Sequence, residues 1–199
     1  IIQDYVASDV GKPAGAQPDW YWCGSTTLWC LMMSRAVVAY SPNSNVLINV
    51  WGFDESVATG CGADCAGKIF GINPFAAYGD TRFPGIEDVV ALHNKYRLLD
   101  GEDVADYADS AYVRSYVMYK IMFDAMAEVA ASGQAMTRAN VRDALESGYD
   151  SRGITAPIVF SASDHRPTMG AHIYTLDANG RFDYVTQMTL ERRPEWLGW

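Results

Sequence analysis

A short apolar strand followed by a turn and a helix recurs three times in the first half of the chain, and this repetition restricts the fold more than any other feature. Strands are predicted where apolar residues form short continuous runs, at 19–23, 46–51 and 68–72. Helices are predicted at 27–40, in a short segment after 52–56, and at 84–97. Consecutive strand–helix steps place neighbouring strands in parallel. The sequence therefore predicts an α/β fold, with a parallel sheet covered by helices on both faces.

The loops at the carboxyl ends of the predicted strands are the first candidates for a binding site, because ligands collect at this edge of open parallel sheets. Gly24 and Ser25 precede a helix, where small residues expose backbone N–H donors that favour a carboxylate. Aromatic side chains after the second and third strands, and one in the first turn of a later helix, offer apolar or cation–π walls. The predicted ligand-binding residues are Gly24, Ser25, Trp51, Asp54, Glu55, Phe75, Tyr78 and Tyr112.

Asp54 and Glu55 follow the second strand and have two interpretations. In the first, one carboxylate receives an ammonium or hydroxyl group of a ligand, beside an apolar wall supplied by Trp51, Phe75 or Tyr78. In the second, the acids satisfy free N–H groups at the N-terminus of the next helix, whatever the function. The sequence leaves both open.

The second half of the chain begins with one long helix, predicted at 109–131. Residues at steps of three and four form an apolar stripe that we expect to face the core: Tyr112, Tyr116, Tyr119, Phe123, Met126 and Ala130. A further helix is predicted at 138–147, with Thr137 as its N-cap. A strand is predicted at 153–160, followed by a β-hairpin at 172–176 and 181–187.

Charge and motif content exclude several classes of function. A formal net charge of −9 without a basic stripe argues against nucleic-acid binding. The sequence has no nucleophile elbow, HExxH motif or P-loop, and His93 lies on an apolar helix face where a core role is expected. The spacing of the cysteines, with no histidine near them, argues against a metal site. We therefore predict no catalytic residue, no metal and no cofactor.

The four cysteines bear on the cellular compartment. In an oxidising compartment, the glycine-flanked Cys61 and Cys65 can close a small-loop disulfide; in a reducing one, all four cysteines are buried thiols. No apolar run approaches the roughly 20 residues needed to cross a bilayer. The sequence has no initiator methionine and no charged-then-apolar leader, so Ile1 is expected to be an internal start.

The order of several short motifs resembles a known family. PDWYW, VWGFDES and GKIFGINPFA are followed by the tyrosine-rich helix ending in FDAMAEVA, and then by TRANVRDALES, GITAPIVFSASDHRP and IYTLDANGRFDYV. In this order they resemble the later part of type 1 periplasmic substrate-binding proteins. The resemblance covers nearly the whole chain and is greatest to the Leu/Ile/Val-binding family of branched-chain amino acid ABC transporters.

This resemblance implies a type 1 periplasmic-binding-protein-like fold with two lobes, of which the first is incomplete. It implies that residues 1–108 form an α/β unit of the second lobe and that 109–161 are a returning segment of the first lobe. Residues 162–199 would then form a hinge crossing, a second-lobe hairpin and a tail. The stripe on the long helix would face a lobe that the chain largely lacks. We therefore expect the isolated chain to expose much of this stripe and to associate.

The resemblance also implies a function without catalysis. The protein would capture an amino acid or a related small carboxylate between two lobes and deliver it to the membrane permease of an ABC transporter. Its location would be the periplasm or, for a lipoprotein, the outer side of the cell membrane. The many Trp and Tyr residues favour an aromatic or bulky ligand. The alternatives are a ligand-sensing receptor or regulatory module of the same fold and, less favoured, an enzyme of doubly wound fold.

Overall fold

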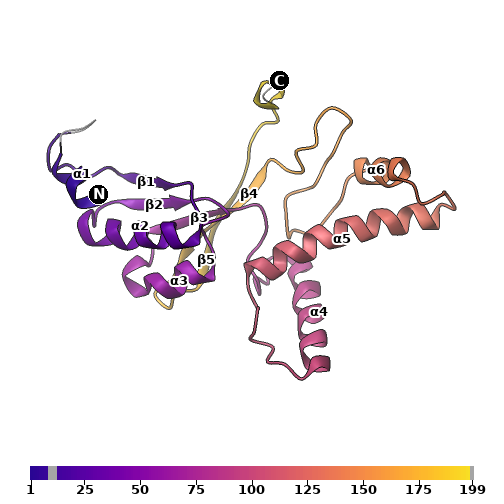
Figure 1. Cartoon of the computed structure of the whole chain (residues 1–199), viewed down its shortest axis with the longest axis horizontal. Coiled ribbons are helices and arrows are strands. Elements are labelled where there is room, and N and C mark those ends of the chain that lie inside the picture. The colour runs from indigo at the N-terminus through magenta and orange to yellow at the C-terminus, as the bar shows by residue number, and fades with distance from the viewer. Residues whose placement is uncertain (9–12, 198–199) are drawn as a thin grey trace. The chain divides into compact units, whose positions relative to one another are not determined.

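The computed structural model describes residues 1–8 and 13–197, and the chain divides into two compact units (Figure 1). Unit 1 comprises Ile1–Asn73 and His172–Gln187, and unit 2 comprises Pro74–Ala171 and Met188–Trp199. These boundaries do not coincide with the predicted divisions at 108/109 and 161/162, because the helix at 84–100 packs against the helix at 110–131 and both belong to unit 2. The assignment of the segments to lobes of a larger protein stays a prediction.

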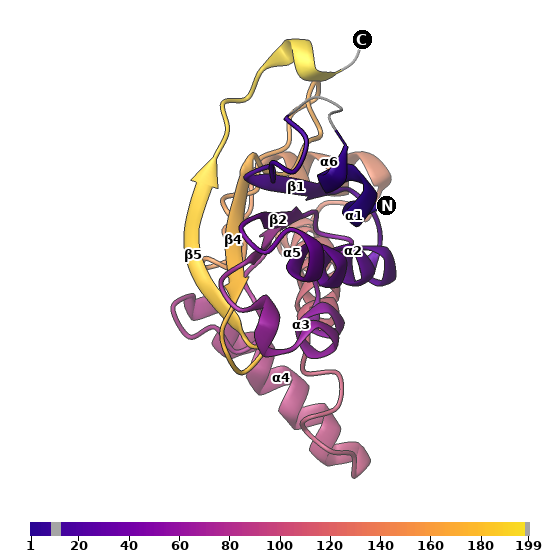
Figure 2. The same cartoon turned by 90° about the vertical axis from the view of Figure 1, so that its left-hand side faces the viewer.

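Unit 1 is built on a five-stranded sheet with the strand order β1-β2-β3-β4-β5. Its strands are β1 (Trp20–Cys23), β2 (Asn45–Ile48), β3 (Ile69–Asn73), β4 (Gly170–Leu176) and β5 (Phe182–Thr189). β1, β2 and β3 are parallel, as the repeated strand–helix steps predict. β4 pairs antiparallel with β3, and the predicted hairpin of β4 and β5 is confirmed (Figure 2).

The helices of unit 1 pack beside this sheet. They are α1 (Ile2–Ala7), α2 (Thr27–Tyr40) and α3 (Glu55–Cys61), followed by a 3-10 turn, η1 (Ala63–Cys65). α2 contacts β1, β2 and α3, and Figure 2 shows α2 and α3 on the same side of the sheet. Burial alternates along the strands, so that Val46, Ile48 and Ile69 are fully buried on one face. The core of unit 1 therefore lies between that face and the helices.

β1 and β2 differ from what their apolar runs predict, which is a buried strand at 19–23 and a strand that continues to residue 51. Trp20 and Trp22 of β1 are 51% and 57% exposed, so β1 is not a buried strand. It is the first strand in the sheet order, and its outer edge pairs with no strand in the described structure. β2 ends at Ile48 instead of residue 51, because the Gly52 N–H bonds to both the backbone and side-chain oxygens of Asn49 and closes a turn there.

Unit 2 is formed mainly by helices. These are α4 (Pro84–Asp100), α5 (Ser110–Ala131) and α6 (Arg138–Glu146), with a 3-10 turn, η2 (Pro194–Leu197), near the C-terminus. α5 contacts both α4 and α6. Thr137 is the N-cap of α6, as predicted, and its hydroxyl accepts the Asn140 N–H at 3.2 Å. The three helices occupy the predicted ranges, although α4 continues three residues further than expected, to Asp100.

Residues 153–160 do not form the predicted strand. Within the described structure they make isolated bridges, in which Thr155 pairs with Phe75 and Ile158 pairs with Tyr149. Pro157 lacks the N–H that a continuous strand ladder needs. The Thr155 N–H is also engaged, since it donates to the Ser151 hydroxyl at 2.8 Å. The segment is therefore held by local bonds instead of by a sheet.

The prediction that the aromatic stripe of α5 faces the core is wrong for Tyr119 and Phe123, whereas Tyr112, Tyr116 and Met126 are half-buried. Tyr119 and Phe123 are 68% and 60% exposed. The buried residues of α5 lie on another face and are mostly small or β-branched: Ser110, Val113, Val117, Ala125 and Val129. Small side chains allow the neighbouring helices, α4 and α6, to approach closely. The expectation that the isolated chain exposes much of the stripe is confirmed for Tyr119 and Phe123.

Both cysteine pairs form disulfides within unit 1. Cys61 joins Cys65, which is one of the two outcomes that the sequence leaves open. Cys23 joins Cys30, with 5.7 Å between the two Cα atoms, and so links the end of β1 to α2. None of the described helices has the length and hydropathy needed to cross a membrane. The described residues include no group of three or more His, Cys, Asp or Glu side chains arranged to hold a metal ion.

Candidate functional site

The carboxyl ends of β1, β2 and β3 share one edge of the unit 1 sheet, because these strands are parallel. Five of the predicted ligand-binding residues lie on the loops and helix starts that follow β1 and β2: Gly24, Ser25, Trp51, Asp54 and Glu55. The remaining three belong to unit 2: Phe75, Tyr78 and Tyr112. The structure therefore divides the predicted residues into two groups, and each is described within its own unit.

Gly24 and Ser25 connect β1 to the N-terminus of α2. A Cβ atom on Gly24 would lie 3.0 Å from Nε1 of the Trp22 indole, so a larger residue would have to shift that ring slightly. Thr26 is the N-cap of α2, but its hydroxyl makes no capping hydrogen bond. An uncapped helix N-terminus presents backbone N–H donors and a partial positive charge, both of which favour a carboxylate.

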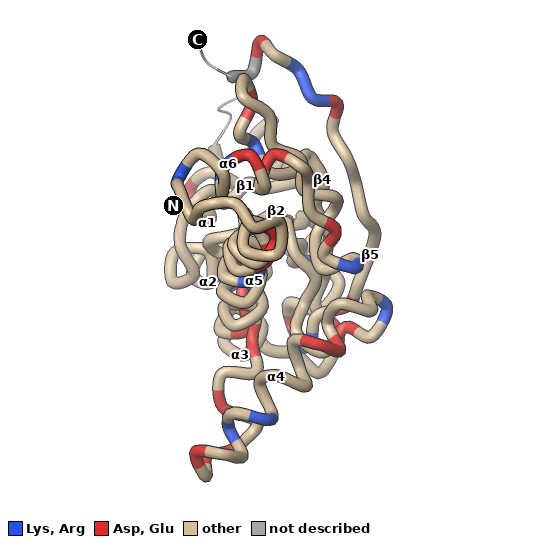
Figure 3. Tube along the Cα trace, turned by 90° about the vertical axis from the view of Figure 1, so that its right-hand side faces the viewer, with Lys and Arg blue, Asp and Glu red and all other residues tan. Residues whose placement is uncertain are grey.

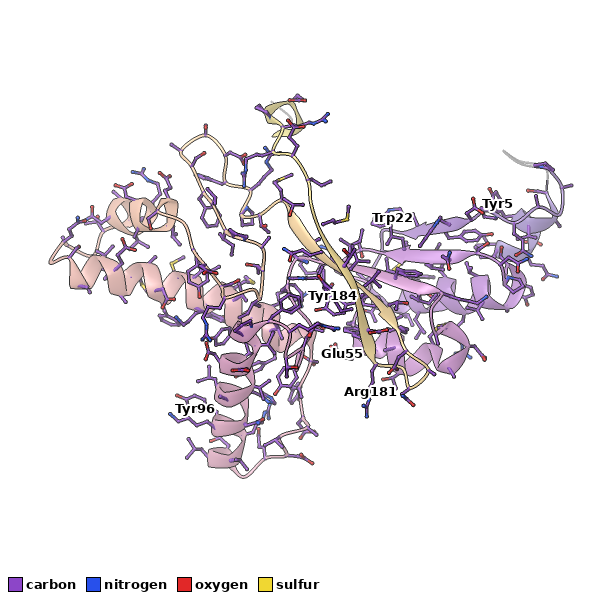
Figure 4. The ribbon with its side chains drawn as sticks, turned by 180° about the vertical axis from the view of Figure 1, so that it is seen from behind. Tyr5, Trp22, Glu55, Tyr96, Arg181 and Tyr184 are labelled. Carbon is purple, nitrogen blue, oxygen red and sulfur yellow. A yellow bond between two sulfur atoms is a disulfide. The ribbon has the colours of Figure 1, made fainter. Side chains whose placement is uncertain are left out.

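Gly24 and Ser25 also line an apolar pocket of about 890 Å³ within unit 1. Its walls come from α1, the end of β1 and one side of α2, and Figure 4 labels Trp22 on β1. The larger side chains in these walls are Trp22, Trp29, Met32, Met33 and Tyr40. An apolar pocket that begins at a helix N-terminus suits a ligand with a carboxylate at one end and an apolar body.

Asp54 has a defined structural role in unit 1. Its Oδ1 accepts the backbone N–H groups of Ser56 and Val57 at 2.9 and 3.3 Å, which makes it the N-cap of α3. Its Oδ2 accepts the hydroxyl of Thr27, in the first turn of α2, at 2.6 Å. These bonds support the capping interpretation of this carboxylate.

Trp51 and Glu55 flank this cap. The Trp51 side chain is 63% exposed, and its carbonyl oxygen accepts a hydrogen bond from the Thr27 hydroxyl at 3.4 Å. Glu55 is half-buried at the first position of α3, where the helix dipole favours an acid (Figure 4). Their role toward a ligand stays a prediction.

In unit 2, Tyr78 and Tyr112 enclose the imidazole of His93. The Tyr78 Oη lies 2.9 Å from His93 Nδ1, and the Tyr112 ring meets the imidazole edge-to-face with 4.5 Å between centroids. Burial raises the pKa of both tyrosines, so their hydroxyls stay neutral at physiological pH. Phe75 is 5% exposed and bridges to Thr155, which places it in the core of unit 2.

Several buried side chains outside the predicted set have polar atoms without a hydrogen-bond partner in the described structure, and two of them lie on β3 and α4. Neither side-chain amide atom of Asn73, the fully buried last residue of β3, has a partner. His93 is 1% exposed, and its Nε2 also has none. Such atoms are rare in folded proteins and mark places for water or a ligand. Asn73 was detectable as an amide at the carboxyl end of a predicted parallel strand, whereas the pattern around His93 indicates a core residue.

Comparisons with protein-family models and with curated proteins found no match. Solved structures gave several matches. A substrate-binding protein of an ABC transporter from Aeropyrum pernix is 25% identical, with a TM-score of 0.72 over 95% of this chain and 47% of that one. A branched-chain amino acid ABC transporter protein from Thermus thermophilus with bound valine is 16% identical, with a TM-score of 0.71 over 86% and 46% of the two chains. A fatty acid ABC transporter substrate-binding protein from Thermomonospora curvata is 17% identical, with a TM-score of 0.67 over 92% and 45%.

The chain spans slightly less than half the length of these proteins. In the first case the match extends over 95% of this chain at a TM-score of 0.72. The resemblance predicted from the order of the motifs is therefore confirmed. The chain has the type 1 periplasmic-binding-protein-like fold and is similar to about half of a substrate-binding protein of the branched-chain amino acid ABC transporter family.

Proposed function

We propose that the protein is the solute-binding component of an ABC importer and captures an amino acid or a related small carboxylate. The observation that carries this proposal is the match of 95% of the chain to an ABC transporter substrate-binding protein at a TM-score of 0.72. The compounds named for the two other similar proteins, valine and a fatty acid, share a carboxylate group. No chemical step is proposed, because capture for import requires binding and release alone.

The geometry of unit 1 supports a carboxylate with an apolar or aromatic body. Gly24 and Ser25 lie at the uncapped N-terminus of α2, where the carboxylate would bind. The indole rings of Trp22 and Trp29 line the pocket that starts at this point.

The proposal includes a membrane permease as partner and a location outside the cytoplasm, in the periplasm or on an extracellular lipoprotein. The disulfides Cys23–Cys30 and Cys61–Cys65 support this location. Disulfides form and persist in oxidising compartments and are rare in the cytosol of most organisms.

Isothermal titration calorimetry of the purified chain tests the proposal. The panel contains valine, phenylalanine, benzoate and octanoate, each paired with its amide as a control that lacks the negative charge. Ligand concentrations up to about 10 mM detect weak binding, since a Kd of about 1 mM still corresponds to about −4 kcal/mol. We expect binding of at least one acid and none of its amide. A folded chain that binds none of the four acids would contradict the proposal.

A substitution at the helix N-terminus localises the site. Gly24→Val adds a branched side chain where a Cβ atom already lies 3.0 Å from the Trp22 ring, and should weaken binding of the acid at least about tenfold. The matched control is Ala63→Val, at an exposed position in η1 outside the pocket. Equal affinities for the two variants would show that the carboxylate does not bind at the start of α2.

A further inference from the structure

A second pocket, of about 440 Å³, lies within unit 2. It is bounded by the C-terminal half of α4, the loop at 101–109 and the first turn of α5. Its lining residues are His93, Tyr96, Arg97, Asp100, Glu102, Tyr107 and Tyr112. Of the predicted ligand-binding residues, only Tyr112 lines this pocket.

Tyrosine rings form much of this lining. Tyr96 and Tyr107 are 53% and 68% exposed, and Figure 4 shows Tyr96 projecting from α4. The faces of such rings attract cations. Two side chains of the protein already show this attraction: the Arg97 guanidinium carbon lies 4.6 Å from the Tyr107 ring centroid, and the Lys95 ammonium lies 5.5 Å from that of Tyr96.

The charges around the pocket also favour a cation. Arg97 is paired with the Glu102 carboxylate, so its positive charge is already compensated. Asp100 forms no ion pair with any described residue. It is the last residue of α4, where the helix dipole disfavours a carboxylate. Figure 3 shows further acidic segments along the loop that follows. An anion would be repelled here, and a bound cation would offset the charge of Asp100.

The inner wall of the pocket offers a hydrogen-bond acceptor. The His93 Nδ1 lies 2.9 Å from the Tyr78 hydroxyl, while its Nε2 is buried and without a partner in the described structure. When Nδ1 carries the proton and donates it to Tyr78, Nε2 has a free lone pair. A ligand N–H group would satisfy this atom, and an ammonium ion supplies both the N–H and the positive charge.

We propose that the pocket binds a small organic ammonium ion. The rings of Tyr96 and Tyr112 contact the cation, Asp100 supplies the opposite charge, and His93 Nε2 accepts an N–H bond from a primary ammonium. This site goes beyond the proposed capture of a carboxylate solute, and it lies entirely on residues of unit 2.

Saturation-transfer NMR on the purified chain tests the proposal with three probes at matched ionic strength: n-butylammonium, tetramethylammonium and n-butanol. We expect both cations to bind and n-butylammonium to bind more tightly, because tetramethylammonium has no N–H for His93. n-Butanol has the same alkyl chain without the charge and should bind at least about tenfold more weakly than n-butylammonium. Binding of n-butanol as tight as that of n-butylammonium, or binding of neither cation, would overturn the proposal. Neither result bears on solute capture by unit 1, because none of the three probes carries a carboxylate.

Matched variants distinguish a built site from general attraction to an acidic surface. Asp100→Asn should weaken n-butylammonium binding at least about fivefold. Asp106→Asn removes an equal charge from the loop that follows α4, outside the pocket, and should change the affinity less than about twofold. Tyr96→Phe keeps the ring and should retain binding, whereas Tyr96→Leu should weaken it at least about threefold. Equal losses for Asp100→Asn and Asp106→Asn would refute the pocket as the site.

Discussion

Replacing Asp54 by alanine separates the two interpretations of this carboxylate. The substitution removes the acceptor of three hydrogen bonds at once. Two come from the backbone N–H groups of Ser56 and Val57 at the start of α3, and the third comes from the hydroxyl of Thr27 in α2. Asp54 therefore both caps one helix and ties it to another.

The cost of the substitution follows from these bonds. Loss of an N-cap side chain costs about 1 kcal/mol. A hydrogen bond to a charged group contributes about 1.5–3 kcal/mol, and the lower end applies here because Asp54 and Thr27 are half-buried. Asp54→Ala should therefore lower the free energy of unfolding of unit 1 by roughly 2–3 kcal/mol. Asp54→Ser keeps a capping oxygen and should cost about 1 kcal/mol less than the alanine variant.

Urea unfolding followed by tryptophan fluorescence measures this change, since unit 1 contains Trp20, Trp22, Trp29 and Trp51. The control is Glu55→Ala, which removes the next acid from the same helix and should cost about 0.3–1 kcal/mol through the helix dipole. Equal losses at the two positions would refute the capping role. If Asp54→Ser stays folded yet abolishes binding of the acids, the carboxylate contacts the ligand as well.

Three further predictions concern packing, ionisation and association. A Cβ atom at Gly71 would lie 2.0 Å from the Phe53 ring, so Gly71→Ala should lower the free energy of unfolding by about 1–3 kcal/mol. In the control Gly60→Ala, the new Cβ atom meets the end of a flexible leucine side chain, and the free energy of unfolding should change by less than about 1 kcal/mol. Similar changes for both variants would contradict the packing argument. Burial, with a smaller contribution from nearby carboxylates, raises the pKa of Tyr149 to about 12 from 10.0. In a pH titration followed by phenolate absorbance, the difference between the wild-type protein and Tyr149→Phe should therefore have its midpoint near pH 12. Since the folded-state pKa is raised, this tyrosine stabilises the fold below pH 10 and loses that contribution as the pH rises toward 12; titration near pH 10 would disprove the shift. Phe123 is 60% exposed, so Phe123→Ser should reduce the self-association measured by sedimentation velocity. The same substitution should change the free energy of unfolding by less than about 0.5 kcal/mol. A wild-type chain that is already monomeric would contradict this expectation.

The positions of most helices and strands could be predicted from the sequence because they depend on local rules. Short apolar runs locate β1, β2 and β3, and the Thr137 cap locates the start of α6. Pro157 lies in the one predicted strand that the structure lacks, and the absence of its N–H is also a local property. The apolar residues of this segment favour a strand, and the proline argues against one.

The candidate site was less predictable. Gly24 and Ser25 were identified from their place between a strand and a helix, but the pocket that they share with Trp22 and Trp29 depends on how α1 and α2 pack beside β1. His93 shows the same limit: its helix position predicts burial, while the unpartnered Nε2 depends on where Tyr78 and Tyr112 lie around the ring. Contacts between residues distant in the sequence are set by packing.

The α/β class, the parallel arrangement of β1 to β3 and the resemblance to periplasmic substrate-binding proteins can all be read from the amino-acid sequence, because each follows from the order and spacing of local patterns. The buried face of α5, in contrast, depends on how the helices pack. Val113 and Val117 recur at helical spacing as regularly as Tyr119 and Phe123, so periodicity alone cannot choose between the two faces. The choice depends on the partners available: the small and β-branched side chains let α4 and α6 approach, and the larger aromatic rings are left exposed.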